Sequence, residues 1–357
     1  MRVMFVANGM LPTLQLSFIK PLARSVQDGD VMLETMTEQD IRDAFGKAPD
    51  DTEVHSWIAN RLARFRPDLI VFCRYSGPYS RYMTDRARRE GIPTIYHIDD
   101  DLLNIPIEIG EAKHRYHNAP ERTGSVRHLL DTCDLVYAST KRLGERLKTE
   151  KVATPITVGQ IYCPGHVITP ATRRPVRKFG YMASADHAHN LEMILPAIVD
   201  VMRDNPDVSF ELFGSIPRPA ALAEFGDRVV CLPPIQNYEQ FLTEFAKLNW
   251  DIGVCPLTPI DFNLMKANTK WVEYTSVGAA VVASRDTVYD ECCSDGCGIL
   301  ASTPEEWRAG LEHLIRDPDA HYEQVKRAQK KLETEYSIDQ LRSQVFDVFE
   351  TVRKTNM

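Results

Sequence analysis

The sequence predicts an α/β protein made of two doubly wound domains, each with a parallel sheet. The chain has 357 residues, more than a single hydrophobic core usually serves. Short runs rich in β-branched residues alternate with longer amphipathic segments, which is the pattern of βαβ units around a parallel sheet. This alternation is interrupted by a proline-rich stretch near the middle and then begins again.

The first half of the chain predicts one complete domain. Its expected strands are 2–7, 30–36, 68–73, 93–98, 134–139 and 155–161. Helical periodicity predicts helices at 52–65, 79–90, 122–132 and 140–149. Residues 163–175, CPGHVITPATRRP, hold three prolines and a glycine. We therefore expect an N-terminal domain at 1–163 and a linker at 164–176.

The second half repeats the same pattern and predicts a C-terminal domain at 177–335. Its expected strands are 177–183, 209–214, 228–234, 251–257, 279–284 and 298–302. Its expected helices are 189–204, 238–247, 268–277, 304–316 and 319–333. The segment 336–357 holds a last helix that could pack back on the N-terminal domain. Paired sheets of this kind bind ligands beyond the carboxyl ends of their strands, on either side of a cleft.

Composition excludes several classes of protein. The net charge of −8 argues against a general nucleic-acid binder. No run approaches the roughly 18 apolar residues of a transmembrane helix, and the first apolar stretch is too short for a signal peptide. We therefore expect a cytoplasmic protein. Peripheral contact with the inner membrane face stays open, although no strongly basic amphipathic helix supports it.

The cysteines favour buried thiols over disulfides or zinc. Most of the eight lie inside apolar segments. Cys292, Cys293 and Cys297 lie close together in the sequence, but no second CxxC pair or neighbouring His completes a zinc motif. We predict no metal ligands.

Residues 250–284 contain the most informative pattern in the chain. A buried strand is followed by a polar loop and then by a helix. Lys266, Lys270 and Glu273 share one face if this helix includes Lys266; otherwise Lys266 lies in the loop before it. Cations beside the N–H groups of a helix N-terminus suit a diphosphate, and a carboxylate can accept two hydrogen bonds from a ribose diol. The alternative is an ordinary amphipathic helix with a solvated face.

This segment resembles the donor-binding segment of group 1, family 4-like glycosyltransferases with the GT-B fold. The matching residues are Pro256, Leu257, Phe262, Asn263, Lys266, Lys270, Glu273, Tyr274, Gly278 and Val281–Ser284. A weaker likeness extends over 1–350. The resemblance implies a retaining, nucleotide-sugar-dependent enzyme in which Lys266 and Lys270 hold the diphosphate and stabilise its developing charge. It also implies that Glu273 holds the ribose.

The resemblance implies further donor contacts, and the sequence departs from the family at several positions, among them Met265 and Ala280. The expected donor-binding residues besides Lys266, Lys270 and Glu273 are Gly9, Ser184, Asp186, His187, Tyr238, Asn263 and Asn268. By their chemistry alone, the residues around Asp186 form either an anion site or a helix cap. Met265 occupies the position where many relatives carry a second Glu.

An acidic triplet, Asp99, Asp100 and Asp101, follows a predicted strand of the first domain. One reading is a metal-dependent GT-A transferase in which Asp99 and Asp101 hold Mg²⁺ or Mn²⁺. The preferred reading places Asp99 and Asp100 at the acceptor, where Asp99 orients a hydroxyl or accepts its proton. His97 alternates with Tyr96 along the strand and is expected in the core.

We therefore expect a glycosyltransferase that moves a hexosyl or pentosyl group from a UDP- or GDP-type sugar to an acceptor hydroxyl. No cofactor is required, and Mg²⁺ or Mn²⁺ is not expected. The acceptor could be a saccharide, a lipid-linked sugar, a metabolite or a modified base. Alternatives are an epimerase or hydrolase of the same fold and a non-catalytic nucleotide-sugar-binding subunit. A dehydrogenase is disfavoured because no GxGxxG motif follows either first strand.

Overall fold

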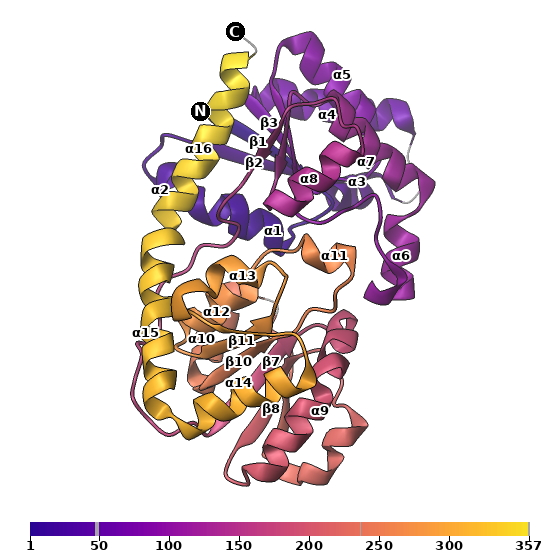
Figure 1. The fold of residues 1–357 in the computed structure, drawn as a ribbon. Coiled ribbons are helices and arrows are strands. Elements are labelled where there is room, and N and C mark those ends of the chain that lie inside the picture. The colour runs from indigo at the N-terminus through magenta and orange to yellow at the C-terminus, as the bar shows by residue number, and fades with distance from the viewer. Residues whose placement is uncertain (47–49, 236, 356–357) are drawn as a thin grey trace. The chain divides into compact units, whose positions relative to one another are not determined.

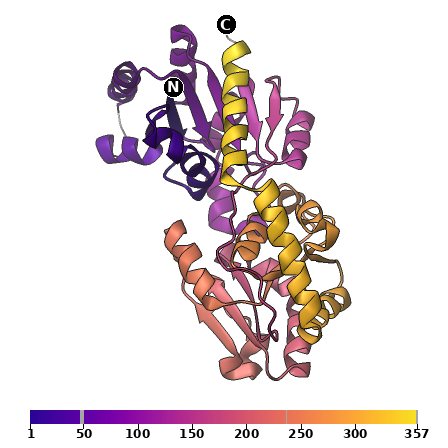
Figure 2. The same ribbon diagram turned by 90° about the vertical axis from the view of Figure 1, so that its left-hand side faces the viewer.

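The computed structural model describes residues 1–46, 50–235 and 237–355, and the chain forms two compact units (Figures 1 and 2). Unit 1 comprises Met1–Tyr162, Met265–Ala267 and Ile338–Met357. Unit 2 comprises Cys163–Leu264 and Asn268–Ser337. Each unit contains one parallel sheet of six strands with helices packed against it, so the predicted fold class is confirmed.

The sheet of unit 1 has the strand order β2-β1-β3-β4-β5-β6. Its strands are β1 (Arg2–Ala7), β2 (Met32–Thr37), β3 (Leu69–Cys73), β4 (Thr94–Ile98), β5 (Leu135–Ala138) and β6 (Ile156–Val158). All neighbouring strands are parallel. Every residue of β3, β4 and β5 is buried, as expected for strands covered on both faces.

The α-helices of unit 1 are α1 (Pro12–Leu14), α2 (Lys20–Gln27), α3 (Glu38–Phe45), α4 (Asp51–Phe65), α5 (Ser80–Glu90), α6 (Glu111–His117), α7 (Pro120–Thr132), α8 (Lys141–Thr149) and α16 (Ile338–Thr355). The side chains of Thr37, Asp50 and Thr140 accept from free backbone N–H groups at the starts of α3, α4 and α8. Thr37 and Asp40 form a capping box on α3, which fixes the chain just after β2.

Helix α16 returns from the end of the chain to unit 1 and lies beside α2 (Figures 1 and 2). Gln344 donates to the carbonyl oxygen of Ile161 at 2.9 Å and accepts from the N–H groups of Gln160 and Ile161. The ring of Phe349 stacks on Phe18 at 6.4 Å between centroids. The last helix is thus an integral part of the unit 1 core.

The sheet of unit 2 has the strand order β12-β11-β10-β7-β8-β9. Its strands are β7 (Lys178–Ala183), β8 (Ser209–Gly214), β9 (Val229–Leu232), β10 (Ile252–Cys255), β11 (Ala280–Ser284) and β12 (Ile299–Ala301). Its α-helices are α9 (Ala188–Asp204), α10 (Tyr238–Leu248), α11 (Asp261–Leu264), α12 (Thr269–Ser276), α13 (Tyr289–Cys292), α14 (Pro304–Arg316) and α15 (Pro318–Glu335).

Three helical regions of unit 1 were not expected from the sequence. The first, α1 to α2, contains Pro12 and Pro21, which disfavour a helix interior. A π-helical turn, Gln15–Ile19, separates the two prolines, so each lies at the start of an α-helix. The others, α3 and α6, are short and mostly polar, so their periodicity is weak.

The proline-rich segment expected as a linker packs closely on unit 2. The backbone N–H groups of Ile168 and Thr169 both donate to the carbonyl oxygen of Ser276, at 2.7 and 3.1 Å. Gly165 donates to the carbonyl oxygen of Tyr336 at 2.8 Å. Prolines suit this path because the backbone here joins no sheet and needs few donors.

Gly253 allows α12 to pack directly on β10. A Cβ atom at this position would lie 2.3 Å from the ring of Tyr274, which is fully buried. The Tyr274 hydroxyl accepts from the N–H group of Met182 at 2.9 Å and thereby connects α12 to β7. The absence of a side chain at Gly253 therefore positions the first turn of α12 next to the end of β7.

We expect Gly253→Ala to lower the free energy of unfolding by about 1–3 kcal/mol, because the added methyl group overpacks the interface. Gly124→Ala is the control, since Gly124 lies in helix α7 and a Cβ there meets nothing within 4 Å. That substitution should stabilise the protein by about 0.5–1 kcal/mol. Urea denaturation measures both, and a Gly253→Ala protein as stable as wild type would contradict the packing argument.

Candidate functional site

A pocket of about 260 Å³ lies at the carboxyl edge of the unit 2 sheet. Strand β7 lies between β8 and β10, so the crossovers on its two sides run in opposite directions. Ligands of doubly wound sheets bind at such a switch point. The residues that line the pocket are Met182, Ala183, Ser184, His187, Phe213, Gly214, Ser215, Pro234, Ile235, Phe241, Thr269, Lys270 and Glu273.

The first turn of α12 contributes the charged part of this pocket. The helix begins at Thr269, after Asn268, whose side chain makes no capping hydrogen bond to the helix. Lys270 and Glu273 are separated by one turn and both line the pocket. The backbone N–H groups of the first turn carry the positive end of the helix dipole to the same place.

Glu273 is a buried carboxyl group with a strongly altered proton affinity. Its exposed fraction is 6%, and burial raises its pKa to about 7. The positive charge of Lys270 and a hydrogen bond from the Tyr238 hydroxyl both oppose this rise. The Glu273 carboxylate has two hydrogen-bond-accepting oxygens and is therefore suited to bind a ligand diol. The two hydroxyl groups would replace the water molecules that the carboxylate lost on folding.

The other expected donor residues of unit 2 fall into two groups. Ser184 and His187 line the pocket, and Asp186 lies between them in a short 3-10 turn. Tyr238 reaches the pocket through its hydrogen bond to Glu273 and also contacts the Cys163 sulfur at 3.6 Å.

Asn263 and Asn268 have protein partners instead. The Asn263 amide is fully buried and donates to Asn190 Oδ1 and Thr258 Oγ1 at 3.2 and 2.9 Å. The Asn268 amide donates to the Tyr336 hydroxyl at 3.0 Å. Both side chains therefore shape the loop around α11 and α12.

Gly214 and Ser215 line the pocket but were not singled out from the sequence. The φ of Gly214 is +125°, and a Cβ atom there would lie 2.2 Å from the Ala183 carbonyl oxygen. Only glycine fits this close approach between the ends of β7 and β8. A glycine directly after an apolar strand was the available signal.

Lys266 belongs to unit 1, whereas Lys270 belongs to unit 2. Because α12 begins at Thr269, Lys266 lies in the preceding loop, the second of the two arrangements expected. Its ammonium nitrogen is 3.6 Å from Asp100 Oδ1. The neighbouring carbonyl oxygen of Met265 accepts from Thr140 Oγ1 at 2.8 Å.

The acidic triplet of unit 1 is compensated by positive side chains. Arg74 Nη1 lies 2.9 Å from Asp99 and 3.0 Å from Asp100. Arg146 Nε lies 3.2 Å from Asp101, which also accepts from the N–H group of Leu103. No local pattern predicts these pairings, because Arg74 is 25 residues from Asp99 and Arg146 is 45 residues from Asp101.

Asp99 is the most buried pairing partner of Arg74. Its carboxylate accepts from the hydroxyl groups of Thr13 and Tyr162, both at 2.7 Å. Although burial opposes ionisation, Arg74 and these hydrogen bonds lower the Asp99 pKa below its usual value. A lowered pKa makes the Asp99 carboxylate a weaker proton acceptor than an ordinary aspartate. His97 lies in the core beside Phe18, as expected, and burial lowers its pKa to about 4.

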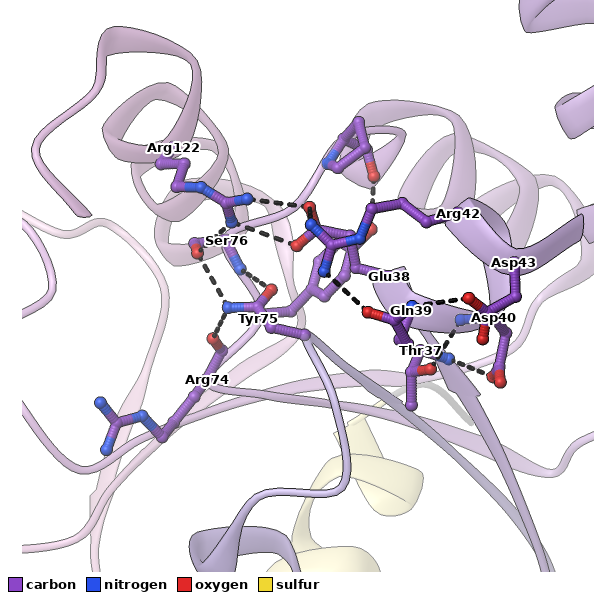
Figure 3. A network of polar contacts seen from close by, with 12 residues as sticks. Thr37, Glu38, Gln39, Asp40, Arg42, Asp43, Arg74, Tyr75, Ser76 and Arg122 are labelled. Atoms are coloured by element: carbon purple, nitrogen blue, oxygen red, sulfur yellow. Dashed lines mark hydrogen bonds and ion pairs between the residues drawn. The ribbon is translucent and has the colours of Figure 1, made fainter. Parts of the chain in front are cut away.

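Gly9 lies just after strand β1. The residue that precedes it, Asn8, forms hydrogen bonds between the turn that follows β1 and the turn that follows β3. The Asn8 amide donates to the Arg74 carbonyl oxygen at 3.3 Å and to the Ser76 hydroxyl at 3.0 Å (Figure 3 shows the Arg74 to Ser76 turn). Strand β1 lies between β2 and β3, so this is the switch point of unit 1.

The comparisons with known proteins agree with the fold described above. Residues 196–347 match a family model described as glycosyl transferase-like. HepE from Anabaena, solved in complex with UDP, has a TM-score of 0.65 at 15% identity over 98% of this chain and 100% of that chain. The chain has the GT-B fold and carries a glycosyltransferase-like domain.

Two further GT-B structures cover nearly the whole chain. Sucrose-phosphate synthase from Thermosynechococcus elongatus has a TM-score of 0.67 at 10% identity, over 99% of this chain and 100% of that chain. A UDP-forming trehalose-phosphate synthase from Burkholderia xenovorans has a TM-score of 0.63 at 12% identity, over 98% and 99% of the two chains. No curated protein sequence matches the chain.

The GT-B fold overturns the GT-A alternative for the acidic triplet. GT-B proteins have two sheets of the kind found here, whereas the alternative required a single nucleotide-binding domain. Asp99 and Asp101 are each paired with an arginine. Within the described ranges 1–46, 50–235 and 237–355, no group of three or more His, Cys, Asp or Glu side chains is placed to hold a metal ion.

The cysteines and helices also bear on the composition-based expectations. None of the eight cysteines, all of which lie within the described residues, forms a disulfide, and every one except Cys231 is buried. Among the described residues, no helix is both long and apolar enough to cross a membrane.

Proposed function

We propose that this GT-B protein transfers a sugar from a UDP-sugar to an acceptor hydroxyl, with retention of configuration and without a required metal. The observation that carries the proposal is the presence of Lys270 and Glu273 in one pocket at the switch point of unit 2. HepE, which shares the fold, has been solved with UDP and with UDP-glucose. We therefore take UDP as the first choice of nucleotide.

Lys270 would bind the diphosphate and stabilise the negative charge that grows on it as the glycosidic bond breaks. The N–H groups at the start of α12 would add to this stabilisation. A group that interacts with developing charge stabilises the transition state more than the ground state. Its main effect is therefore on the rate of the chemical step. Because a lysine supplies the counter-charge, a divalent cation is not needed for this task.

Glu273 would accept hydrogen bonds from the two ribose hydroxyl groups. Ser184 and His187 line the same pocket and would contact the phosphates or the transferred sugar. Retention is supported by a trehalose-6-phosphate synthase of the same fold, whose structure is described as an insight into glycosyl transfer with retention.

In unit 1, Asp100 is better suited than Asp99 to contact the acceptor. The Asp100 side chain is 16% exposed, against 6% for Asp99. Asp99 already accepts from two hydroxyl groups and pairs with Arg74. We propose that Asp99 orients Arg74 and that Asp100 hydrogen-bonds the acceptor hydroxyl.

A thermal-shift comparison of UDP, GDP, ADP and TDP tests the donor assignment. A nucleotide at 100 times its dissociation constant stabilises the folded protein by about 2.7 kcal/mol, which is a readily measured rise in Tm. We expect the largest rise with UDP. A larger rise with GDP would reassign the base, and no rise with any of the four would contradict a nucleotide-sugar site.

Turnover assays separate transfer from the two alternative functions. An epimerase or hydrolase consumes UDP-glucose when no acceptor is present. A non-catalytic subunit binds UDP-glucose tightly and turns over none of it with any acceptor. A transferase consumes the donor mainly when its acceptor is added, because the closed site excludes water.

A further inference from the structure

A polar network fills the switch point of unit 1 (Figure 3). We call it the Glu38 network, and it consists of Asn8, Glu38, Arg42, Ser76, Tyr116 and Arg122. These residues come from the turns after β1 and β3 and from helices α3, α6 and α7. The position is where a doubly wound sheet binds its ligand.

The network is rigidly built at its buried end. Arg122 donates from both terminal nitrogens to the Glu38 carboxylate, at 2.8 and 3.2 Å. It also donates to the Ser76 hydroxyl at 3.2 Å, and the Ser76 N–H group donates to Asn8 Oδ1 at 3.1 Å. The Arg122 and Glu38 side chains are only 11% and 7% exposed. Buried pairs of this kind hold a fixed geometry.

The other end of the network opens to solvent. The Arg42 side chain, 3.3 Å from Glu38, is 42% exposed, and Tyr116 is 41% exposed. Arg42 donates a hydrogen bond to the Tyr116 hydroxyl. The Arg122 guanidinium lies 3.8 Å from the centre of the Tyr116 ring. The exposed edge is thus formed by the Arg42 guanidinium and the Tyr116 ring, and the buried Arg122 guanidinium lies against that ring.

Positive charge exceeds negative charge at this edge. Arg42 and Arg122 share the single carboxylate of Glu38. Of the other acids of α3, Asp40 lies 3.7 Å from Arg61, which pairs its charge outside the network, and Asp43 accepts from the Gln39 amide.

The neighbouring groups do not cancel this excess. Arg74 and Lys266 balance Asp99 and Asp100. His117 lies on the same helix as Tyr116, and its pKa is lowered to about 4. Burial is the main cause, and the positive charges of Arg74, Arg122 and Lys113 add to it. The negative charge of Asp100 opposes the shift.

His117 supplies a second polar group that points to a ligand. Its Nδ1 atom is buried and has no hydrogen-bond partner among the described residues. An unsatisfied buried nitrogen costs about 1–3 kcal/mol, so a bound group that hydrogen-bonds it is favoured. Arg74, in the turn that also contains Ser76, has a left-handed backbone with a φ of 50°. Such strain is often found where a ligand binds.

We propose that the exposed edge of the Glu38 network binds a phosphate or carboxylate group of the acceptor through Arg42, with the positive charge of the buried Arg122 behind it. The inference rests on the proposed function for the role of the bound molecule as acceptor. A planar guanidinium group recognises either oxyanion through parallel hydrogen bonds. The acceptor is therefore an anionic saccharide or metabolite, and a neutral sugar would lack the group that this edge holds.

Calorimetry on the full chain with saturating UDP tests this class of acceptor. The probes are glucose 6-phosphate, glucuronate and glucose, which separate a phosphate, a carboxylate and a neutral sugar. We expect at least one anionic sugar to bind about 10-fold more tightly than glucose, and the tighter of the two identifies the anion. Equal binding of all three probes, or no binding of either anion, would overturn the proposal.

Arg42→Gln is the main variant, because Arg42 is partly exposed and its loss leaves the Arg122–Glu38 pair intact. We expect it to weaken the anionic probe at least about 5-fold without changing the affinity for glucose. The matched control is Arg88→Gln on α5, whose side chain is 65% exposed and pairs with Asp85. An equal loss in both variants, or none in Arg42→Gln, would contradict the site.

Glu38→Gln gives a result of opposite sign. It removes the carboxylate that competes for both arginines, so a folded Glu38→Gln protein should bind the anionic probe more tightly than wild type. A weaker affinity in that folded variant would count against the proposal. If Glu38→Gln does not fold, the Arg42→Gln comparison still decides.

Failure of the donor assignment can be told apart from failure of this inference. Arg42→Gln should bind UDP as wild type does, because Arg42 lies in unit 1 and the UDP pocket in unit 2. If UDP does not bind but an anionic sugar binds through Arg42, the proposed function fails and the anion site stands. If UDP binds and no anionic sugar does, the anion site fails alone.

Discussion

Lys270→Ala is expected to lower kcat/KM for sugar transfer by about 100- to 1,000-fold, the usual effect of removing one group that stabilises developing charge. Lys270 lies on the first turn of α12 and lines the unit 2 pocket. The loss should appear chiefly in kcat, because the negative charge on the diphosphate increases in the transition state. Release of UDP from UDP-glucose in the presence of acceptor measures the rate.

Binding measurements can test the Lys270 assignment before an acceptor is known. Lys270→Ala should weaken UDP at least about 10-fold and leave uridine unchanged, because uridine has no diphosphate. The control is Lys247→Ala on α10, whose side chain is 65% exposed and pairs with Glu244. An unchanged affinity for UDP in Lys270→Ala, with an unchanged Tm, would show that the diphosphate binds elsewhere.

Glu273→Gln is expected to weaken both uridine and UDP by about 10- to 100-fold, because each ribose hydroxyl loses a charged hydrogen-bond acceptor. This pattern differs from that of Lys270→Ala, which affects UDP alone. 2′-Deoxyuridine, which lacks one ribose hydroxyl, allows a thermodynamic cycle that combines a change in the ligand with a change in the protein. It should bind wild type more weakly than uridine does, and Glu273→Gln should discriminate less between the two ligands. Full discrimination in the variant would place the ribose away from Glu273.

The pKa of about 7 at Glu273 adds a pH dependence to the same experiment. The ionised carboxylate is the better acceptor for the ribose hydroxyls, so uridine should bind more tightly as the pH rises from about 6 to 8. Uridine is the probe because it lacks phosphate groups, which titrate near pH 6. Glu273→Gln should show a flat profile in this range.

Stability should change in the opposite direction. The folded protein holds the Glu273 proton up to about pH 7, whereas the unfolded chain releases it near the ordinary value of 4.5. Between these two values the folded state binds more protons, so Glu273 destabilises the fold increasingly as the pH rises, by up to about 3 kcal/mol. Denaturation of wild type and Glu273→Gln at pH 5 and pH 7.5 should reveal a growing difference in favour of the variant.

The twelve strands and the division into two sheets could be predicted from the sequence. Central strands such as Leu69–Cys73 are buried on both faces, so they appear as short continuous apolar runs. Long helices with one apolar face were also visible, as for Pro304–Arg316. Short polar helices such as Glu111–His117, which buries no residue, carry no such pattern.

The candidate donor site was predicted in part. Lys270 and Glu273 are three residues apart on one helix, and local spacing alone brings them to the same place. The opposite wall of the pocket, at Gly214 and Phe213, comes from another strand about 56 residues earlier, and only the parallel pairing of the sheet brings it near. The inclusion of Lys266 in unit 1 likewise follows from long-range contacts.

By itself, the sequence determined the α/β class, the strands of both sheets and the helix that presents Lys270 and Glu273. Each of these depends on periodicity or spacing within a few residues. Only the tertiary structure decided that Asp99 is held by Arg74, that Glu38 joins Arg122 from 84 residues away, and that burial moves the Glu273 pKa to about 7. Ion pairing and desolvation depend on distance and burial in space, which a linear pattern does not specify.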